Sequence, residues 1–446
     1  MCSTGLLTRS DTGVHRKQLL FGFAFTGAAA TAAFILVMPQ WYLLASVLVI
    51  IGVVSLGSTF VLLNSFLPLL AANHPEVRHR EQQHDAQSAQ LKLSVQISSK
   101  GVGLGYAAAV CVQIFSIVLL VLLKKANFAS ESTPLRCVLF VVGIFWAVLT
   151  IPGALWLRNR PGPSLNTSSM RNTRLPTALQ YLVFAWSSVW KTVKTAARLR
   201  QTGIFLIAWF LLSDAVATVS GTAILFARTE LHMGTIAIAL LSITATASGI
   251  AGAFAWPRIS KQYGFQTKSA IMACVLLMEI IPFYGLLGFL PFVQSWGVGG
   301  LQQAWEIYPL GFVHGFVMGG LSSYCRAFYG EIIPPGSEAA FYALYAITDK
   351  GSSAVGPTIV GAIIDSVGTI RPAFGFLAVL IALPLPILYL VDVQKGHADA
   401  VALSEKGNTH AYQDVAMDDF DGDDDQAPNA GLMRGWEDED LGSGRR

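Results

Sequence analysis

Residues 11–20 read DTGVHRKQLL, a short polar and basic turn that leads directly into an apolar stretch. Residues 256–272, WPRISKQYGFQTKSAIM, repeat this design in the second half of the chain, with a basic turn and a glycine ahead of another apolar stretch. A design that recurs at a distance calls for a search for internal repeats before any fold is assigned. The two turns therefore set the register in which the two halves are compared.

Two further correspondences follow in the same order along the chain. A Lys-Gly pair lies inside a long apolar stretch in each half, as Lys100-Gly101 and Lys350-Gly351. Ahead of it, a triplet of glycine, polar residue and proline recurs with identical spacing, as Gly52, Asn64 and Pro75 and then as Gly311, Ser323 and Pro334. Glycine is common in this chain, so the shared order, and not any single match, indicates the repeat.

Composition indicates a membrane protein. Hydrophobic residues make up 53% of the 446 residues and charged residues only 13%, whereas a soluble domain carries roughly 25% charged residues. A helix needs about 20 apolar residues to cross a bilayer. The sequence predicts an all-α polytopic membrane protein with ten spans, at residues 18–38, 41–70, 91–123, 136–157, 202–226, 234–256, 268–290, 305–328, 339–365 and 372–392.

Lysine and arginine concentrate in one set of the loops between these spans, including residues 78–80, 158–200 and 258–268. Because basic loops stay on the cytosolic side of a membrane, these loops and both chain ends are predicted to be cytosolic. The predicted domains are listed in chain order: an N-terminal bundle at 1–157, a cytosolic central loop at 158–201, a six-helix C-terminal bundle at 202–392 and an acidic, disordered cytosolic tail at 393–446.

The second part of the central loop, TALQYLVFAWSSVWKTVKTAARLR, has helical periodicity with one apolar face and a basic end. A helix of this kind lies in the plane of the membrane interface, with its apolar face toward the lipid. It could equally pack on the cytosolic face of its own bundle. The sequence leaves both placements open.

The repeat also predicts the number of helices. Two spans precede the basic turn at 256–272, and none precedes the turn at 11–20, so ten helices are expected here out of twelve, with the first two missing. Two parallel six-helix halves joined by a cytosolic loop are the major facilitator architecture. The pattern formed by Asp11, Gly13, Arg16 and Lys17 resembles the loop motif of that superfamily without its leading glycine, so Asp11, Arg16 and Lys17 are predicted to be gate residues.

A closer resemblance rests on five stretches, of which the run around Asp349-Lys350-Gly351 is the most specific. They are IFLIAWFLLSD (204–214), TELHMGT (229–235), IPFYGLLGF (281–289), EIIPPGSEAAFYALYAITDKGSS (331–353) and LVDVQKG (390–396). These stretches resemble the fungal autophagy-related amino-acid effluxers of the vacuolar membrane, a divergent major facilitator branch, over about residues 8–400. Members of that family normally have two more helices ahead of the region that matches Asp11.

The resemblance implies a multi-pass protein of the vacuole membrane that exports amino acids to the cytosol during autophagy-linked recycling. We expect neutral or hydrophobic amino acids as substrate, the lipid bilayer as a partner and protons as a candidate coupling ion. No cofactor, metal or nucleic acid is expected. The chain is not expected to be an enzyme, because it lacks the Gly-x-Ser-x-Gly, His-Glu-x-x-His and nucleotide-loop motifs. A non-transporting scaffold or receptor, or a transporter of another small solute, stays open as an alternative.

Charged residues inside the spans are the candidates for the substrate site, because each costs roughly 2.5–3.5 kcal/mol to insert. Asp214 with Lys350 or Lys100 would supply one anion and one cation for a zwitterion. Asn64 and Ser65 would add uncharged hydrogen bonds. The alternatives are a structural ion pair for Asp214, and for the two lysines snorkelling to the interface, gating or helix packing.

Two residues are candidates for proton coupling. His314, between Gly311 and Gly315, titrates near the pH of an acidic compartment, and Asp214 could also carry a proton. A neutral histidine that is bonded to a carbonyl is the alternative for His314.

Near the cytosolic ends, Arg326 and Glu331 are predicted to form a gate ion pair, and Asp349 to belong to the same gate. Asp349 and Lys350 need not pair with each other, because neighbouring side chains point about 100° apart on a helix. Glu279 lies in a peripheral span and is predicted to pair locally.

Overall fold

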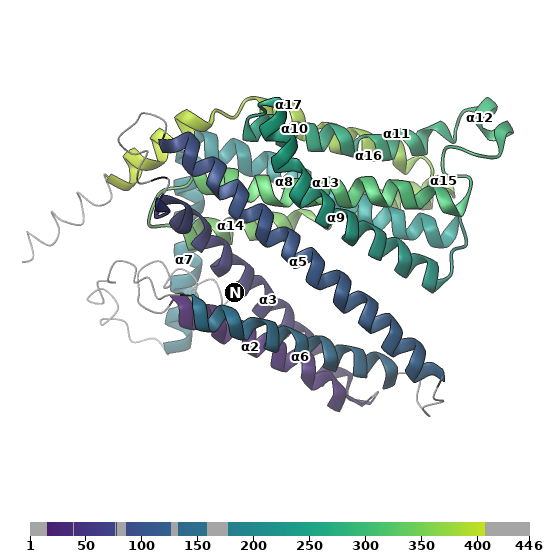
Figure 1. The fold of residues 1–446 in the computed structure, drawn as a ribbon, viewed down its shortest axis with the longest axis horizontal. Coiled ribbons are helices and arrows are strands. Elements are labelled where there is room, and N and C mark those ends of the chain that lie inside the picture. The colour runs from purple at the N-terminus through teal and green to yellow at the C-terminus, as the bar shows by residue number, and fades with distance from the viewer. Residues whose placement is uncertain are drawn as a thin grey trace, which may run out of the picture. The chain divides into compact units, whose positions relative to one another are not determined.

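The computed structural model describes residues 16–38, 40–75, 77, 86–125, 133–157 and 177–405. Every regular element within these ranges is a helix (Figure 1). The helices before residue 200 are α2 (Arg16–Ala32), η1 (Ala33–Leu36), α3 (Tyr42–Ala72), α5 (Ala86–Lys125), α6 (Thr133–Trp156) and α7 (Thr177–Arg198). Asp11, the linker at 158–176 and the part of the predicted tail after residue 405 lie outside the described residues. The first part of that tail, residues 393–405, is a helix and not the disordered segment that was predicted.

The later helices cover the second half of the chain. They are α8 (Arg200–Thr229), α9 (Thr235–Tyr263), α10 (Thr267–Met278), α11 (Ile280–Leu287), α12 (Pro291–Trp296), η3 (Ala304–Glu306), α13 (Ile307–Glu331), α14 (Glu338–Ser352), α15 (Val355–Val367), α16 (Ala373–Ala382) and α17 (Pro384–Tyr389). Each of the ten predicted spans coincides with one helix or with two consecutive ones. Three spans are broken: α10 with α11, α14 with α15, and α16 with α17.

In the described part of the chain, seven helices are long and apolar enough to cross a membrane, or eight if a bent pair counts as one span. Of the ten predicted spans, α13 and the α14–α15 pair are not among those that pass. The break between α14 and α15 leaves two short helices, and α13 carries His314 and many buried residues. α13 and α14 face other helices rather than lipid, which relaxes the need for a continuous apolar sequence in these two helices.

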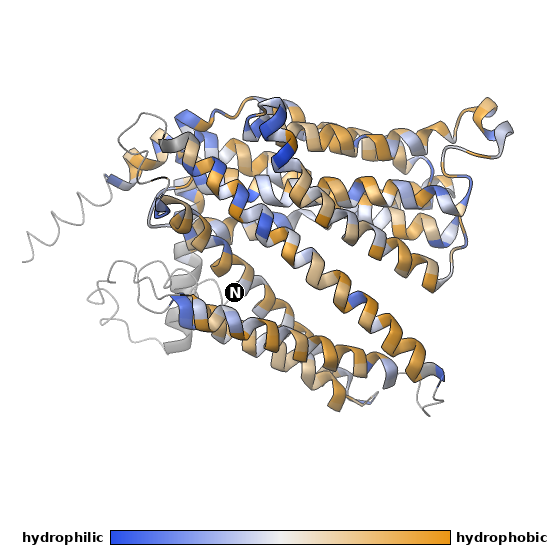
Figure 2. Cartoon of the chain, viewed as in Figure 1, coloured by the Kyte–Doolittle hydropathy of each residue, from blue (hydrophilic) through white to orange (hydrophobic). Residues whose placement is uncertain are grey.

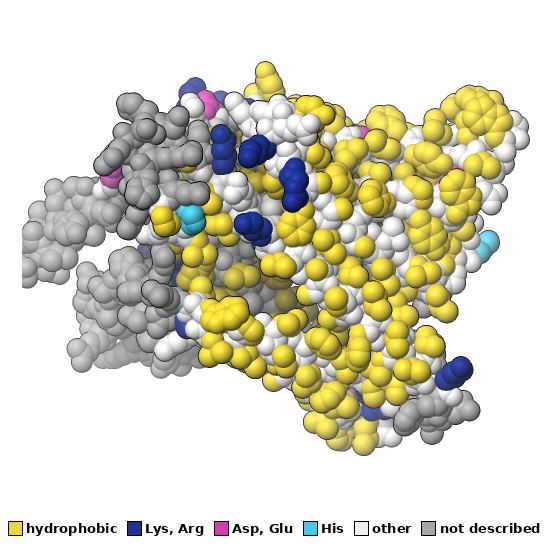
Figure 3. Space-filling view, in the orientation of Figure 1, with side chains coloured by type: hydrophobic (Ala, Val, Ile, Leu, Met, Phe, Trp, Pro, Cys, Tyr) yellow, Lys and Arg dark blue, Asp and Glu magenta, His cyan; other side chains and the backbone are white. Residues whose placement is uncertain are grey.

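Polar residues gather at one end of the helices, where α2, α5 and α8 begin (left in Figure 2). We call this the basic end, since it carries Arg16, Arg198, Arg200, Lys261 and Lys268. Apolar residues cover most of the remaining surface (Figure 3). Large exposed side chains such as Leu104, Leu155 and Val53 would meet lipid acyl chains.

Glycine brings α9 and α13 into backbone contact. A Cβ atom on Gly315 would lie 1.8 Å from the carbonyl oxygen of Ala245, and one on Gly319 would lie 2.2 Å from that of Gly249. From the other side, a Cβ on Gly252 would lie 2.0 Å from the carbonyl oxygen of Phe316. Small residues permit such close approach inside a membrane, where it is a main source of helix association.

The third predicted span, α5, packs across the molecule. It contacts α9 and α13 of the later group as well as α3 and α6 of its own group. The ring of Phe254 packs against Gly103 of α5, and the ring of Tyr106 packs against Gly249 of α9. This interlocking of a ring against a glycine on each helix holds α5 to α9.

The amphipathic segment forms α7, which runs crosswise to the spans at the basic end (Figure 1) and contacts α8 and α14. Ala196 and the following Leu199 are buried, whereas Trp190, Lys191 and Lys194 are exposed. The Lys194 ammonium lies 5.7 Å from the centre of the Trp190 ring. The C-terminal half of α7 therefore packs on its own bundle and presents a basic, aromatic face outward.

A buried carboxylate organises the loop at the opposite end, between α11 and α13. Oε1 of Glu306 accepts hydrogen bonds from the backbone N–H groups of Gly299 and Gln303, both at 3.1 Å. Its Oε2 accepts the N–H of Leu301 at 2.9 Å and the hydroxyl of Tyr284 at 3.0 Å. Gly299 and Leu301 both have positive φ angles, so this carboxylate satisfies the donors of a tightly turned backbone.

Candidate functional site

The break in the α14–α15 span is closed by Asp214. This residue is 2% exposed on α8, and its Oδ1 accepts the backbone N–H of Gly356 at 3.0 Å. The first turn of a helix has free N–H groups, and Ala354, at the N-cap position of α15, offers no side-chain acceptor. Asp214 therefore serves as the cap of α15 from a neighbouring helix, in a position that its own sequence neighbours do not supply.

Asp349 lies on the other side of the same break. Ser213 donates its hydroxyl to the Asp349 carboxylate, which links α8 to the last turn of α14. The second carboxylate oxygen of Asp349 lies 3.0 Å from the Lys350 ammonium, whose side chain is 84% exposed. The two neighbours thus do pair, although the helix geometry alone did not require it. A pair this exposed is worth little in stability, so Lys350 is free to exchange partners.

Lys100 takes no part in the contacts of Asp214, Asp349 and Lys350. It is exposed on α5, and the residues that follow it, 101–123, include no charged side chain. Lys100 therefore stands at the border of the apolar part of α5, where a lysine reaches the headgroup region by snorkelling. This location favours the interfacial role for Lys100.

The two uncharged candidates on α3 are buried. Ser65 is 0% exposed and donates its hydroxyl to the carbonyl oxygen of Leu62 in its own helix at 2.7 Å. Asn64 is 9% exposed. Both lie in the part of α3 that is buried, residues 61–67, and the hydroxyl of Ser65 is already committed to the backbone.

His314 lies on α13 and faces α8. Its Nε2 is 3.1 Å from the hydroxyl of Ser220, and its Nδ1 is buried without a hydrogen-bond partner among the described residues. The partner is a serine hydroxyl and not the carbonyl group that the neutral-histidine alternative supposed.

The predicted gate residue Arg16 joins two distant parts of the chain at the basic end. Its guanidinium lies 3.4 Å from Oε2 of Glu338, and both side chains are less than a tenth exposed. The same guanidinium lies 5.5 Å from the centre of the Phe66 ring on α3. Oε1 of Glu338 accepts the N–H of Gly336 at 3.0 Å. Arg16 thereby ties α2 and α3 to the start of α14, whereas Lys17 is half-buried and takes no part in this contact.

The predicted pair of Arg326 with Glu331 is wrong. Glu331 is 3% exposed, and its Oε1 lies 3.3 Å from Nδ1 of His397, which also lies 3.1 Å from the Glu331 carbonyl oxygen. His397 comes from the segment that follows the last span. This segment is fastened to the same end by Lys268, whose ammonium donates to the carbonyl oxygens of Tyr389 and Val391.

The prediction that Glu279 pairs locally is also wrong. Glu279 lies at the break between α10 and α11 and is 7% exposed. Both of its carboxylate oxygens are buried without a hydrogen-bond partner among the described residues. An ionised carboxylate is costly in such a position.

The contacts of α3 with the later helices are concentrated at the basic end. In α3, residues 61–67 and Ala71 are mostly buried against neighbours that include α14 and α13, while residues 42–54 are mostly exposed. In the second group α14 is largely buried, whereas α15 is largely exposed. Figure 1 shows α2, α3 and α6 diverging from the later helices toward the end that carries α12.

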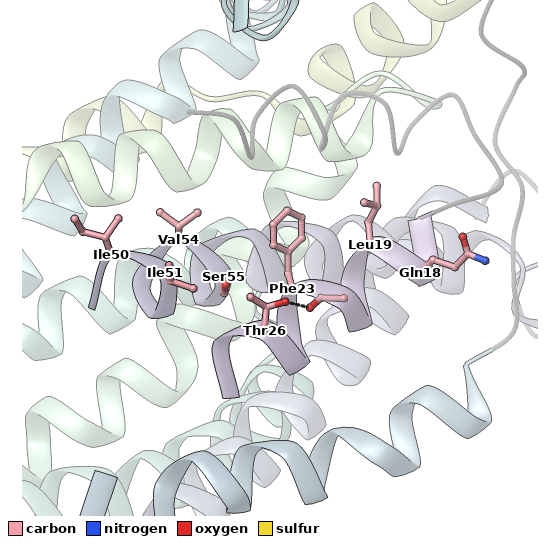
Figure 4. Close-up of a pocket in the computed structure, with 9 residues that line it drawn as sticks. Gln18, Leu19, Phe23, Thr26, Ile50, Ile51, Val54 and Ser55 are labelled. Carbon is pink, nitrogen blue, oxygen red and sulfur yellow. Dashed lines mark hydrogen bonds between the residues drawn. The ribbon is translucent and has the colours of Figure 1, made fainter. Parts of the chain in front are cut away.

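A separate groove lies on the outside, between α2 and α3 (Figure 4). It is lined mainly by apolar side chains, including Leu19, Phe23, Ile50 and Val54. The hydroxyl of Thr26 in this groove is bonded to the carbonyl oxygen of Gly22 at 2.8 Å. None of the predicted site residues lines it, so the groove is not a candidate substrate site.

Sequence reasoning missed the partners that complete these contacts. Glu338, His397, Ser213 and Phe66 each meet a predicted residue from a distant part of the chain. The sequence does contain one signal for Glu338, since a carboxylate follows Pro335-Gly336-Ser337 at the start of a span. Its partner Arg16, 322 residues away, cannot be found without the fold.

These features are those of a multi-pass membrane transporter of the major facilitator type: two groups of helices that pack on each other through α3 and α5, with charged residues and a broken span near their contacts. The major facilitator transporter FucP, whose crystal structure is in the outward conformation, has a similar fold, with a TM-score of 0.54 and 15% identity. That match covers 87% of this chain and 85% of FucP.

Residues 5–401 match the family described as "Vacuole effluxer Atg22 like", and the chain belongs to that family. Autophagy-related protein 22 of Botryotinia fuckeliana is 54% identical over 95% of this chain and 77% of that relative. Autophagy-related protein 22-2 of Aspergillus fumigatus is 51% identical over 89% of this chain and 72% of that relative. The predicted family, architecture and transporter class are thus confirmed, and the enzyme class is excluded by family membership.

Proposed function

We propose that this protein exports neutral or hydrophobic amino acids from the vacuole to the cytosol, as part of the recycling that follows autophagy. The vacuolar location and the direction of transport are suggested by the family description, vacuole effluxer. The link to autophagy is suggested by the names of the relatives. The major facilitator fold supplies a route for a small solute.

The observation that carries the amino-acid assignment is the coexistence of both signs of charge beside an aromatic wall in the interior. Asp349 is partly exposed at the break of the α14–α15 span, and Arg326 is partly exposed on the neighbouring α13. Trp209 and Tyr345 stack beside them with their ring centres 4.5 Å apart. A zwitterion with an apolar side chain needs one anion, one cation and an apolar surface.

The closed contact at the basic end fits one stage of this transport. If basic loops are cytosolic, the Arg16–Glu338 pair closes the cytosolic side, and the helices diverge toward the vacuole lumen. A substrate would then enter from the lumen. Release to the cytosol would require the Arg16–Glu338 contact and the α3–α14 contact to separate.

The test is amino-acid release from vacuolar membrane vesicles. Vesicles with and without the protein are loaded with labelled leucine, lysine, glutamate and glucose, and the release of each solute is followed. We expect leucine to leave faster only from vesicles that contain the protein, with a smaller effect on lysine and glutamate.

Two results would refute the proposal. Equal release of every amino acid from both kinds of vesicle would favour the scaffold alternative. Faster release of glucose alone would indicate a transporter of another solute.

A further inference from the structure

Arg326 is a cation in the interior of the protein without a counter-ion among the described residues. It lies on α13, about one and a half turns before Glu331 at the basic end. Its side chain is partly accessible, and its guanidinium forms no hydrogen bond or ion pair with any described residue. A charge inside a span persists with a partner, with water or with a ligand. Arg326 therefore has capacity for an anion.

Three tyrosines lie within electrostatic range of this cation. Tyr106 of α5, Tyr342 and Tyr345 of α14 all interact electrostatically with Arg326. The hydroxyl of Tyr342 donates to the Arg326 carbonyl oxygen at 2.9 Å, which fixes α14 against α13 at this level. The side chain of Arg326 thus faces the space where α5, α13 and α14 meet, with hydroxyl groups from both groups of helices around it.

Tyr345 connects this cation to the candidate anion. Tyr342, Tyr345 and Asp349 are spaced three and four residues apart, so they lie along one face of α14. The phenol of Tyr345 interacts electrostatically with Arg326 and with Asp349. Its ring stacks on Trp209 of α8, whose indole N–H is buried without an acceptor among the described residues. Tyr345 therefore stands between two opposite charges and forms part of an aromatic wall.

We propose that Arg326 binds the carboxylate of the transported amino acid, that Asp349 receives its ammonium group, and that Trp209 and Tyr345 contact its side chain. A guanidinium presents paired N–H groups that match a carboxylate. The ammonium group would replace the exposed Lys350 at Asp349. Asp214 is excluded from this role, because its carboxylate caps α15. The inference rests on the proposed function and assigns its binding residues.

The test compares ligands that lack one charge each. The purified full chain in detergent is titrated with leucine, with leucinamide, which lacks the carboxylate, and with 4-methylpentanoate, which lacks the ammonium group. Binding is measured as the rise in unfolding temperature. The variants are Arg326→Gln, Arg326→Lys and Asp349→Asn, with Arg228→Gln as the matched control, since Arg228 is exposed at the end of α8.

We expect wild type to bind leucine at least about tenfold more tightly than leucinamide, because hydrogen bonds to charged groups contribute that much. Arg326→Gln should remove this preference by weakening leucine binding alone, and Asp349→Asn should remove the preference for leucine over 4-methylpentanoate. Arg228→Gln should change neither. Arg326→Lys keeps the charge, so it should fold and show a reduced preference.

An unchanged preference for leucine in Arg326→Gln, or in Arg326→Lys if Arg326→Gln does not fold, would overturn the inference and leave the proposed function standing. Wild type that binds no amino acid would overturn the proposed function itself. The unfolding temperature of each variant is also measured without ligand. This measurement distinguishes both outcomes from a variant that has failed to fold.

Discussion

The carboxylate of Asp214 accepts the backbone N–H of Gly356 at 3.0 Å, across two helices and 142 residues of sequence. Only glycine permits this approach, because a Cβ at residue 356 would lie 1.9 Å from the hydroxyl oxygen of Thr218 and 3.1 Å from Oδ2 of Asp214. An acid inside a span is usually read as a substrate or proton site. Here its hydrogen bond holds together a span that is broken in its middle.

Removing this cap should destabilise the protein. We expect Asp214→Ala to lower the free energy of unfolding by about 1–2 kcal/mol, the usual cost of losing a helix cap. Asp214→Asn keeps an acceptor oxygen and should cost less. Unfolding of the detergent-solubilised protein measures both, with Asp365→Asn, an exposed carboxylate on α15, as the control. Wild-type stability in Asp214→Ala would contradict the capping role.

The glycine contact between α9 and α13 gives a second prediction. Gly315→Ala should be strongly destabilising, because its Cβ would overlap the carbonyl oxygen of Ala245; overpacking a core costs about 1–3 kcal/mol. The matched control is Gly361→Ala, a helical glycine of α15 with open space around it, which should be neutral or stabilising by about 0.5–1 kcal/mol. Thermal unfolding measures the stability of both variants. Equal changes in stability at the two glycines would refute the packing argument.

The buried Arg16–Glu338 ion pair gives a third prediction. Glu338→Gln should destabilise the closed arrangement by up to about 3–5 kcal/mol, since it removes the negative charge from a buried ion pair. The double change Arg16→Met with Glu338→Leu should recover most of the loss, because it removes both charges together. Lys395→Gln breaks the exposed pair with Asp392 and should cost under about 1 kcal/mol. Unfolding measurements on the four proteins test this order.

The loop between α11 and α13, which is organised by the Glu306 carboxylate, gives a fourth prediction. Glu306→Gln replaces one acceptor oxygen with a donor group that faces backbone N–H groups, so residues 297–303 should lose their fixed conformation. Hydrogen exchange followed by mass spectrometry should show faster exchange in these residues and no change in α13. Glu230→Gln, at an exposed carboxylate, is the control. Unchanged protection of the loop would show that its glycines hold the conformation without the carboxylate.

The sequence predicts the helices well and their breaks poorly. Apolar stretches located a helix, or two consecutive helices, at each of the ten predicted spans, because lipid imposes a minimum length on every segment that crosses it. The sequence predicts a continuous span from 339 to 365, whereas the structure interrupts it between Ser352 and Val355. Small residues at 351–354 are compatible with an unbroken helix, and what stabilises the break is Asp214, on another helix.

The candidate site shows the same division. Sequence reasoning selected Asp214, Arg326, Asp349 and Lys350 as charges that need an explanation, and the structure gives a contact for Asp214, Asp349 and Lys350. Sequence reasoning could not assign the roles of these charges. A charged residue inside a span has the same appearance in the sequence whether it caps a helix, pairs with a neighbour or meets solvent. Proximity in sequence predicts a pair of Arg326 with Glu331, whereas the partner of Glu331 is His397, beyond the last predicted span.

The backbone contact of α9 and α13 also determines how different states of this protein should be compared. Where the glycines lie, backbone meets backbone without an intervening side chain, so the two helices fit in a single way and must travel together. The pair is therefore the natural reference frame: when a second conformation is superposed on α9 and α13, displacements of α2, α3 and α6 will measure transport motion directly. Alignment on the whole chain would spread that motion over every helix.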